Sequence, residues 1–146
     1  MDICVIIRKI DSKGKLLKHA NYPVPVPVQD LPPINTSTFL GPSGMLRASH
    51  RVSQIQKSHS DEIPRYSHRK AEPLEAGRRV SLEIPIWPIG MVFGEGEGLS
   101  LIVAGHELGF NDMAPPPKVP IDVNRGVHSI YTGIGTESFL VLPVIS

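Results

Sequence analysis

The segment from Arg79 to Gly105 constrains the fold most, because its apolar residues recur at every second position on both sides of a glycine-rich turn. Apolar side chains alternate with others from Val80 to Trp87 and from Leu99 to Ala104, as in strands with one buried face. Gly94–Gly98 supplies the positive φ of a turn, and Pro85, which lacks a backbone donor, places the first strand at a sheet edge or a bend. Two such strands cannot bury their apolar faces alone, so the sequence predicts an all-β chain with two sheets, a β-sandwich.

A second strand is expected at Asp2–Ile10, where Ile3, Val5 and Ile7 alternate with residues that are themselves largely apolar. Apolar side chains on both faces are typical of a strand in the middle of a sheet. The turn that follows is predicted over 11–14, with an aspartate at its start and a glycine at its end.

Two irregular, proline-rich segments are expected, at 20–44 and at 106–125. In the first, proline occupies every second position from Pro23 to Pro27, which favours an extended polyproline II backbone over strand pairing. The segment is read as a plain connection, with a docking motif for a proline-recognising module as the alternative. Val127–Thr132 and Ser138–Ile145 alternate again and predict a closing hairpin.

Composition narrows the class of protein. The 146 residues suit one domain, 1–146, and the net charge of +1 without a basic cluster argues against nucleic acid as a partner. The chain has one cysteine, Cys4, and no apolar run near the roughly 20 residues of a membrane span. Because no secretory leader pattern is present, we expect a cytoplasmic chain that does not enter a membrane.

The stretch Met45–Ile55 is predicted to be a strand with a polar and an apolar face. Its interface candidates are the two arginines and the histidine between them, since an arginine on a strand can project toward a partner's carboxylates or aromatic rings. These residues are Arg47, His50 and Arg51. The alternative is a solvated strand face.

No catalytic constellation is found. Gly41-Pro42-Ser43-Gly44 does not match a nucleophile elbow, and His106-Glu107 is not followed by the second histidine of a zinc-binding helix. The six histidines show no ligand spacing. We therefore assign no catalytic residue, no metal site and no cofactor from the sequence.

The order of several motifs nevertheless resembles a known family. The stretches that carry the resemblance are Asp2–Asp11, Leu46–Arg51, Pro73–Gly77, Ile86–Phe93, Gly96–Leu101, Asn124–His128 and Leu140–Ile145. They are similar to the C-terminal domain of X-Pro dipeptidyl-peptidases and cocaine-esterase-type serine hydrolases. The residues expected to have a structural role in these motifs are Trp87, Pro88, Phe93, Gly96 and His128. Glu97 and Gly98 depart from the pattern, since the family has His and Arg there.

The resemblance implies a jelly-roll sandwich of the galactose-binding-like type. In that family the sandwich packs against an α/β-hydrolase domain that holds the catalytic triad, so the implied role is non-catalytic: stability, walling of the active site and assembly. The parent activity would be hydrolysis of esters, amides or X-Pro peptides.

The resemblance also implies that the first strands of the sandwich, before Asp2, are lacking. The N-terminal strand would then expose an unpaired edge, through which we expect self-association.

The alternative function is a stand-alone carbohydrate- or protein-binding jelly roll. It requires an exposed aromatic platform, whereas Trp87 is expected in a core-like turn.

Overall fold

The architecture comes from a computed structural model of the chain, which describes residues 1–20, 24–31, 38–39, 41–52, 64–106 and 124–145. Within these residues the regular structure consists of strands and two short 3₁₀ turns, which confirms the predicted all-β class. The strands are β1 (Asp2–Ile10), β2 (His19–Ala20), β3 (Thr38–Phe39), β4 (Ser43–Arg47) and β5 (Gly98–Ala104), and the 3₁₀ turns are η1 (Val28–Asp30) and η2 (Ala48–His50). No described helix is long and apolar enough to cross a membrane.

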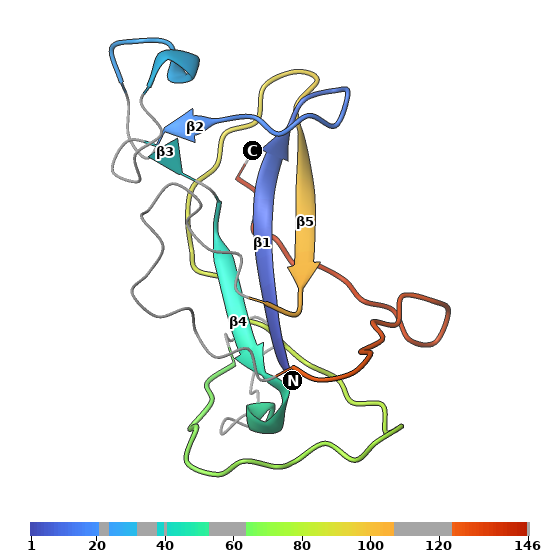
Figure 1. Cartoon of the computed structure of the whole chain (residues 1–146). Coiled ribbons are helices and arrows are strands. Elements are labelled where there is room, and N and C mark those ends of the chain that lie inside the picture. The colour runs from blue at the N-terminus through green and yellow to red at the C-terminus, as the bar shows by residue number, and fades with distance from the viewer. Residues whose placement is uncertain (21–23, 32–37, 40, 53–63, 107–123, 146) are drawn as a thin grey trace.

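The strand β1 lies at the centre of a three-stranded antiparallel sheet of order β4-β1-β5 (Figure 1). Its register joins Asp2 to Arg47 on the β4 side, and Cys4 to Ala104 on the β5 side. The predicted mid-sheet strand is therefore confirmed. The expectation that β1 has an unpaired edge is wrong, because segments distant in sequence supply both neighbours.

The core is built around this central strand. Ile3 to Ile7 are five consecutive buried residues, so side chains on both faces of β1 are covered. Leu46 and Ala48, on and just after β4, are buried with them. A strand that is apolar on both faces can occupy only such an interior position, which is why the sheet forms around β1.

Of the two strands predicted around the glycine-rich turn, β5 is confirmed and Val80–Trp87 is wrong as a strand. The side chains that were predicted to face the core still do so: Leu82 and Ile84 are half-buried, whereas Glu83 between them is exposed. Its backbone joins β4 by one hydrogen bond, from the Trp87 N–H to the Ser43 carbonyl at 3.1 Å. Pairing with a neighbouring strand needs a backbone N–H donor at every second residue, and Pro85 has no backbone N–H.

The predicted turns form where glycine or aspartate specifies them. Asp11 accepts hydrogen bonds from the N–H groups of Lys13 and Lys15, and Gly14 takes a φ of 81°. At the other end of the chain, Thr136 N–H donates to the Gly133 carbonyl at 2.9 Å, so the turn of the closing hairpin exists. Its two arms form no strand in the described residues, and that part of the prediction is wrong.

Candidate functional site

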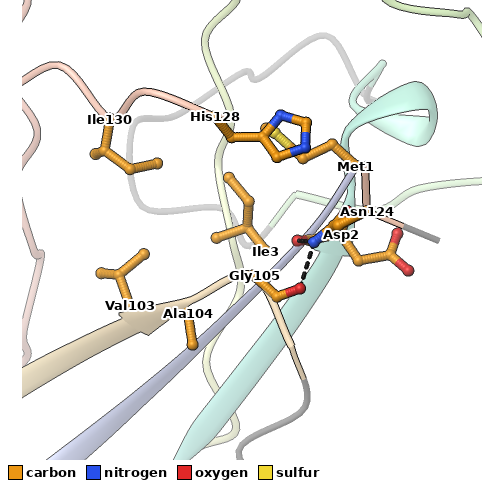
Figure 2. Close-up of a pocket in the computed structure, with 9 residues that line it drawn as sticks. All are labelled: Met1, Asp2, Ile3, Val103, Ala104, Gly105, Asn124, His128 and Ile130. Atoms are coloured by element: carbon orange, nitrogen blue, oxygen red, sulfur yellow. Dashed lines mark hydrogen bonds between the residues drawn. The ribbon is translucent and has the colours of Figure 1, made fainter. Parts of the chain in front are cut away.

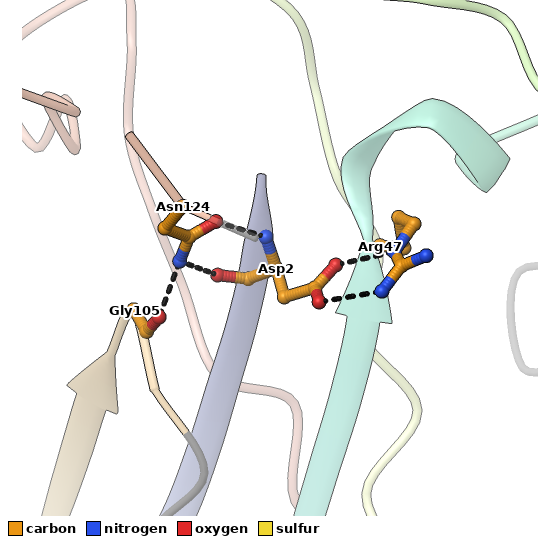
Figure 3. Close-up of polar contacts among 4 residues, drawn as sticks. All are labelled: Asp2, Arg47, Gly105 and Asn124. Atoms are coloured by element: carbon orange, nitrogen blue, oxygen red, sulfur yellow. Dashed lines mark hydrogen bonds and ion pairs between the residues drawn. The ribbon is translucent and has the colours of Figure 1, made fainter. Parts of the chain in front are cut away.

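Arg47, the first interface candidate, ends β4 and forms an ion pair with Asp2 across the sheet (Figure 3). Its Nε and Nη2 donate to the two carboxylate oxygens of Asp2, at 2.7 and 2.9 Å. Such a two-point contact is the strong form of an arginine–carboxylate pair. It holds the pKa of the Asp2 carboxyl below its usual range. The Arg47 side chain remains about half exposed and accessible to a partner.

Arg51, the second candidate, turns toward its own chain. Its Nη1 donates to the Ala48 carbonyl at 3.2 Å and to the Glu72 carbonyl at 2.9 Å, and its Nη2 lies 3.5 Å from the Glu72 carboxylate. The N–H of Glu72 in turn donates to the Ser49 carbonyl. Arg51 therefore fastens the segment around Glu72 to η2, and its side chain is largely buried.

His50, the third candidate, lies at the end of η2 beside a second histidine. The rings of His50 and His68 are 5.3 Å apart at their centroids, and Tyr66 approaches His68 edge-on at 6.4 Å. Tyr66 donates from its hydroxyl to the Glu83 carbonyl at 2.5 Å, and burial raises the pKa of this phenol. Of the strand predicted over Met45–Ile55, the part up to Arg47 is confirmed within β4, and the part from Ala48 to Val52 is wrong, because the chain turns there into η2. Residues 53–55 lie outside the described residues.

The polar contact that sequence reasoning missed is made by Asn124. Its Oδ1 accepts the Asp2 N–H at 2.6 Å, and its Nδ2 donates to the carbonyls of Asp2 and Gly105 (Figure 3). We call these contacts the Asn124 clamp. The side-chain amide continues the hydrogen bonding of the β1–β5 ladder past Ala104. In the sequence, Asn124-Arg125-Gly126 marks only a turn, and the partner lies 122 residues away.

A shallow pocket of about 200 Å³ opens beside the clamp (Figure 2). Its apolar wall is formed by Ile3, Val103 and Ile130, and Asn124 and His128 supply the polar side chains at its lining. His128, for which a structural role is predicted, lies at the lining of this pocket with an exposed side chain. Within the described part of the chain, no three His, Cys, Asp or Glu side chains converge as metal ligands.

The remaining motif residues lie at or near the surface. Gly96 takes a φ of 76°, as its turn requires, and Phe93 is partly exposed with the Lys9 ammonium 5.8 Å from its ring centroid. Pro88 is exposed, and Trp87 is 77 % exposed. The expectation of a core-like position for Trp87 is wrong.

The departure from the family pattern at Glu97 has a local function in the turn. Its carboxylate lies 2.5 Å from the Lys9 ammonium and accepts the Gly94 N–H at 2.6 Å. These contacts, the lysine first, lower the pKa of Glu97. They fix the start of β5 against β1.

Comparison with known proteins identifies the family. The sequence-family model that describes the X-Pro dipeptidyl-peptidase C-terminal non-catalytic domain matches residues 1–141 of the chain. The chain belongs to this family. Searches of curated proteins and of solved structures each returned no match.

Membership agrees with the fold and with the inferred role. The domain of this family is of the β-sandwich type, to which an antiparallel, strand-dominated structure conforms. It is the non-catalytic C-terminal part of X-Pro dipeptidyl-peptidase-type enzymes, so association with a catalytic domain follows from the family.

Proposed function

We propose that the chain acts as one domain, 1–146, which packs against an α/β-hydrolase domain, in the same polypeptide or as a separate chain. There it stabilises the enzyme, walls the active site and contributes to assembly. The parent activity is serine-type hydrolysis of X-Pro peptides, esters or amides. The observation that carries this proposal is the amount of apolar side chain left exposed at one end of the chain.

We call this set the C-terminal apolar surface, and each of its side chains is at least 77 % exposed. It consists of Val127, Ile134, Phe139, Val141, Val144 and Ile145. Covering one such side chain contributes roughly 1.5–3 kcal/mol, so leaving all of them in water is costly for a domain of ordinary stability. A contiguous patch of exposed apolar side chains is typical of a surface that a partner covers, and we propose that these six side chains belong to such a surface.

A binding measurement tests the proposal. The purified chain is titrated calorimetrically with an α/β-hydrolase domain from an X-Pro dipeptidyl-peptidase of this family. We expect binding that Phe139→Asp weakens at least tenfold, because the variant places a charge among buried apolar groups. The matched control is Thr132→Asp, an exposed position outside the apolar surface, which should bind as wild type. Equal affinities for both variants would contradict the proposed surface.

An activity assay tests the non-catalytic role separately. The chain alone should turn over neither nitrophenyl esters nor an X-Pro chromogenic peptide. Turnover that a serine-directed inhibitor abolishes would contradict the role.

One observation favours the second candidate, carbohydrate binding. Trp87 is 77 % exposed, so its indole is available to stack on a sugar ring. Glycan-array binding that is lost in Trp87→Ala would support this function. Binding that survives the substitution would leave Trp87 without that role.

A further inference from the structure

Two histidines from separate segments of the chain meet at the end of η2. His50 closes η2, and His68 belongs to the segment 64–70. Their ring centroids are 5.3 Å apart and their planes are inclined by 53°, so the rings are close without being stacked face to face. The contacts of Arg51 with Glu72, which fasten the same region to η2, involve neither ring.

The spacing of the two rings suits a shared metal ion. A metal–nitrogen bond of about 2.1 Å, and about 1.1 Å from that nitrogen to the ring centroid, place each centroid about 3.2 Å from the ion. Two such ligands at a tetrahedral angle have centroids about 5.2 Å apart, against the 5.3 Å between His50 and His68. Both imidazoles can therefore ligate one ion without a change in the separation of the rings.

The chain around His68 holds its exposed ring beside His50. Among the described residues, His68 alone of the non-glycine residues has a φ in the left-handed region, at 54°. On one side of it the Ser67 hydroxyl accepts the Arg69 N–H at 3.3 Å, and on the other Tyr66 packs edge-on against the ring. The position of the ring is thus set by its neighbours rather than left to solvent.

The available donors define the class of ion. Imidazole nitrogens suit zinc, copper and nickel, whereas magnesium and calcium take oxygen ligands. The nearby phenol of Tyr66 adds no ligand, because its hydroxyl donates to the Glu83 carbonyl. No third His, Cys, Asp or Glu side chain of the described chain joins the pair. Water can reach the remaining positions of an ion, since the His68 side of the pair is exposed.

The charges around the pair leave room for a cation. Arg47 and Arg51, the basic neighbours of His50, each form an ion pair with a carboxylate of this chain. The basic residues at 69–70, which follow His68, are exposed, so water and salt screen their repulsion of a cation.

We propose that His50 and His68 bind one zinc ion, with water at its remaining positions. The ion would join the end of η2 to the segment 64–70, beside the contacts of Arg51. Two histidines bind zinc more weakly than the four ligands of a structural site, so occupancy depends on the zinc concentration. The site is formed by this chain alone and does not depend on a catalytic domain.

Calorimetric titration of the full chain with zinc chloride tests the site, with the protein purified without a histidine tag. Wild type should bind one zinc ion per chain, and magnesium chloride should give no binding. His50→Gln and His68→Asn should each lower the affinity at least tenfold, since even the loss of a group that only supports a ligand costs about that much. Asparagine tolerates the left-handed φ of position 68 as histidine does, so His68→Asn removes the ligand and keeps the backbone. The matched control, His106→Ala, removes an exposed histidine outside the pair and should bind as wild type.

The ring signals of the histidines identify the ligands without any substitution. In a two-dimensional NMR spectrum of the imidazole rings of wild type, zinc should shift the signals of His50 and His68. Those of His106 and His128 should stay in place. Circular dichroism verifies that the two ligand variants remain folded.

A wild type that binds no zinc would overturn the proposal. So would binding that survives in both His50→Gln and His68→Asn, or zinc-induced shifts confined to other histidines. A loss of affinity in His106→Ala as large as that in His68→Asn would indicate adventitious binding by surface histidines and would equally contradict the site. One-to-one binding that only the two ligand variants lose supports it.

Discussion

Replacing Asn124 with alanine removes the clamp between the start of β1 and the end of β5. The substitution removes the hydrogen bonds of the side-chain amide to the N–H and carbonyl of Asp2 and to the Gly105 carbonyl. The variant should therefore be destabilised by more than a surface substitution.

The magnitude follows from the hydrogen-bond count and the burial. A typical intramolecular hydrogen bond contributes about 1 kcal/mol net, and an unsatisfied buried partner costs about 1–3 kcal/mol. The Asp2 contacts are partly buried, so water replaces part of what is lost. We expect Asn124→Ala to lower the free energy of unfolding by about 2–3 kcal/mol, and the Tm of a domain this size by about 5–10 °C.

Urea denaturation and a thermal melt measure this difference. The matched control is Thr136→Ala, which removes one exposed side-chain bond, from the Thr136 hydroxyl to the Gly133 carbonyl, and keeps the backbone bond of the same turn. It should cost less than about 0.5 kcal/mol. If Asn124→Ala melts within a degree or so of wild type, the clamp does not hold the sheet together and the reasoning is refuted.

Three other predictions concern the sheet. Gly44→Ala should prevent or severely weaken folding, because its Cβ would lie 2.3 Å from the Pro85 carbonyl oxygen, whereas Gly90→Ala meets open space and should melt as wild type. The Asp2 pKa is lowered by Arg47, so the pair stabilises the fold above the unfolded-state pKa of about 3.9, and that stabilisation is lost as pH falls through the lower folded value. Melts from neutral pH to pH 3 should show this loss in wild type and not in Arg47→Ala; equal slopes would contradict it. Cys4 is buried, so a thiol reagent should react with it only at the rate of unfolding, and fast labelling of the native chain would count against the central position of β1.

The central strand and β5 could be predicted from the sequence because their patterns are unambiguous. Apolar residues on both faces of Asp2–Ile10 require a central position, and alternation from Leu99 to Ala104 after a glycine turn requires a strand with one covered face. The strand at Val80–Trp87 failed for a physical reason. Its side chains alternate between buried and exposed as predicted. Strand pairing, however, also requires backbone N–H and C=O groups that match those of a neighbouring strand, and the alternation of side chains carries no information about this.

The polar contacts were missed because they depend on register. Asp2 and Arg47 face one another only after β1 and β4 have aligned, and the residue opposite a strand end cannot be read from local sequence. The same limit applies to Asn124, whose partner is 122 residues away. Arg47 and Arg51 look alike in the sequence, yet one pairs across the sheet and the other bonds to Glu72.

Packing of a catalytic domain, as proposed, relies on apolar side chains of residues 127–145, which form no strand in the described structure and so offer buried area and no backbone ladder. The unpaired edge through which β1 was expected to self-associate does not exist, because β4 and β5 occupy both sides of that strand. Residues distant in sequence therefore complete the sheet around β1, and the alternation of apolar residues within β1 could not show which segments these are.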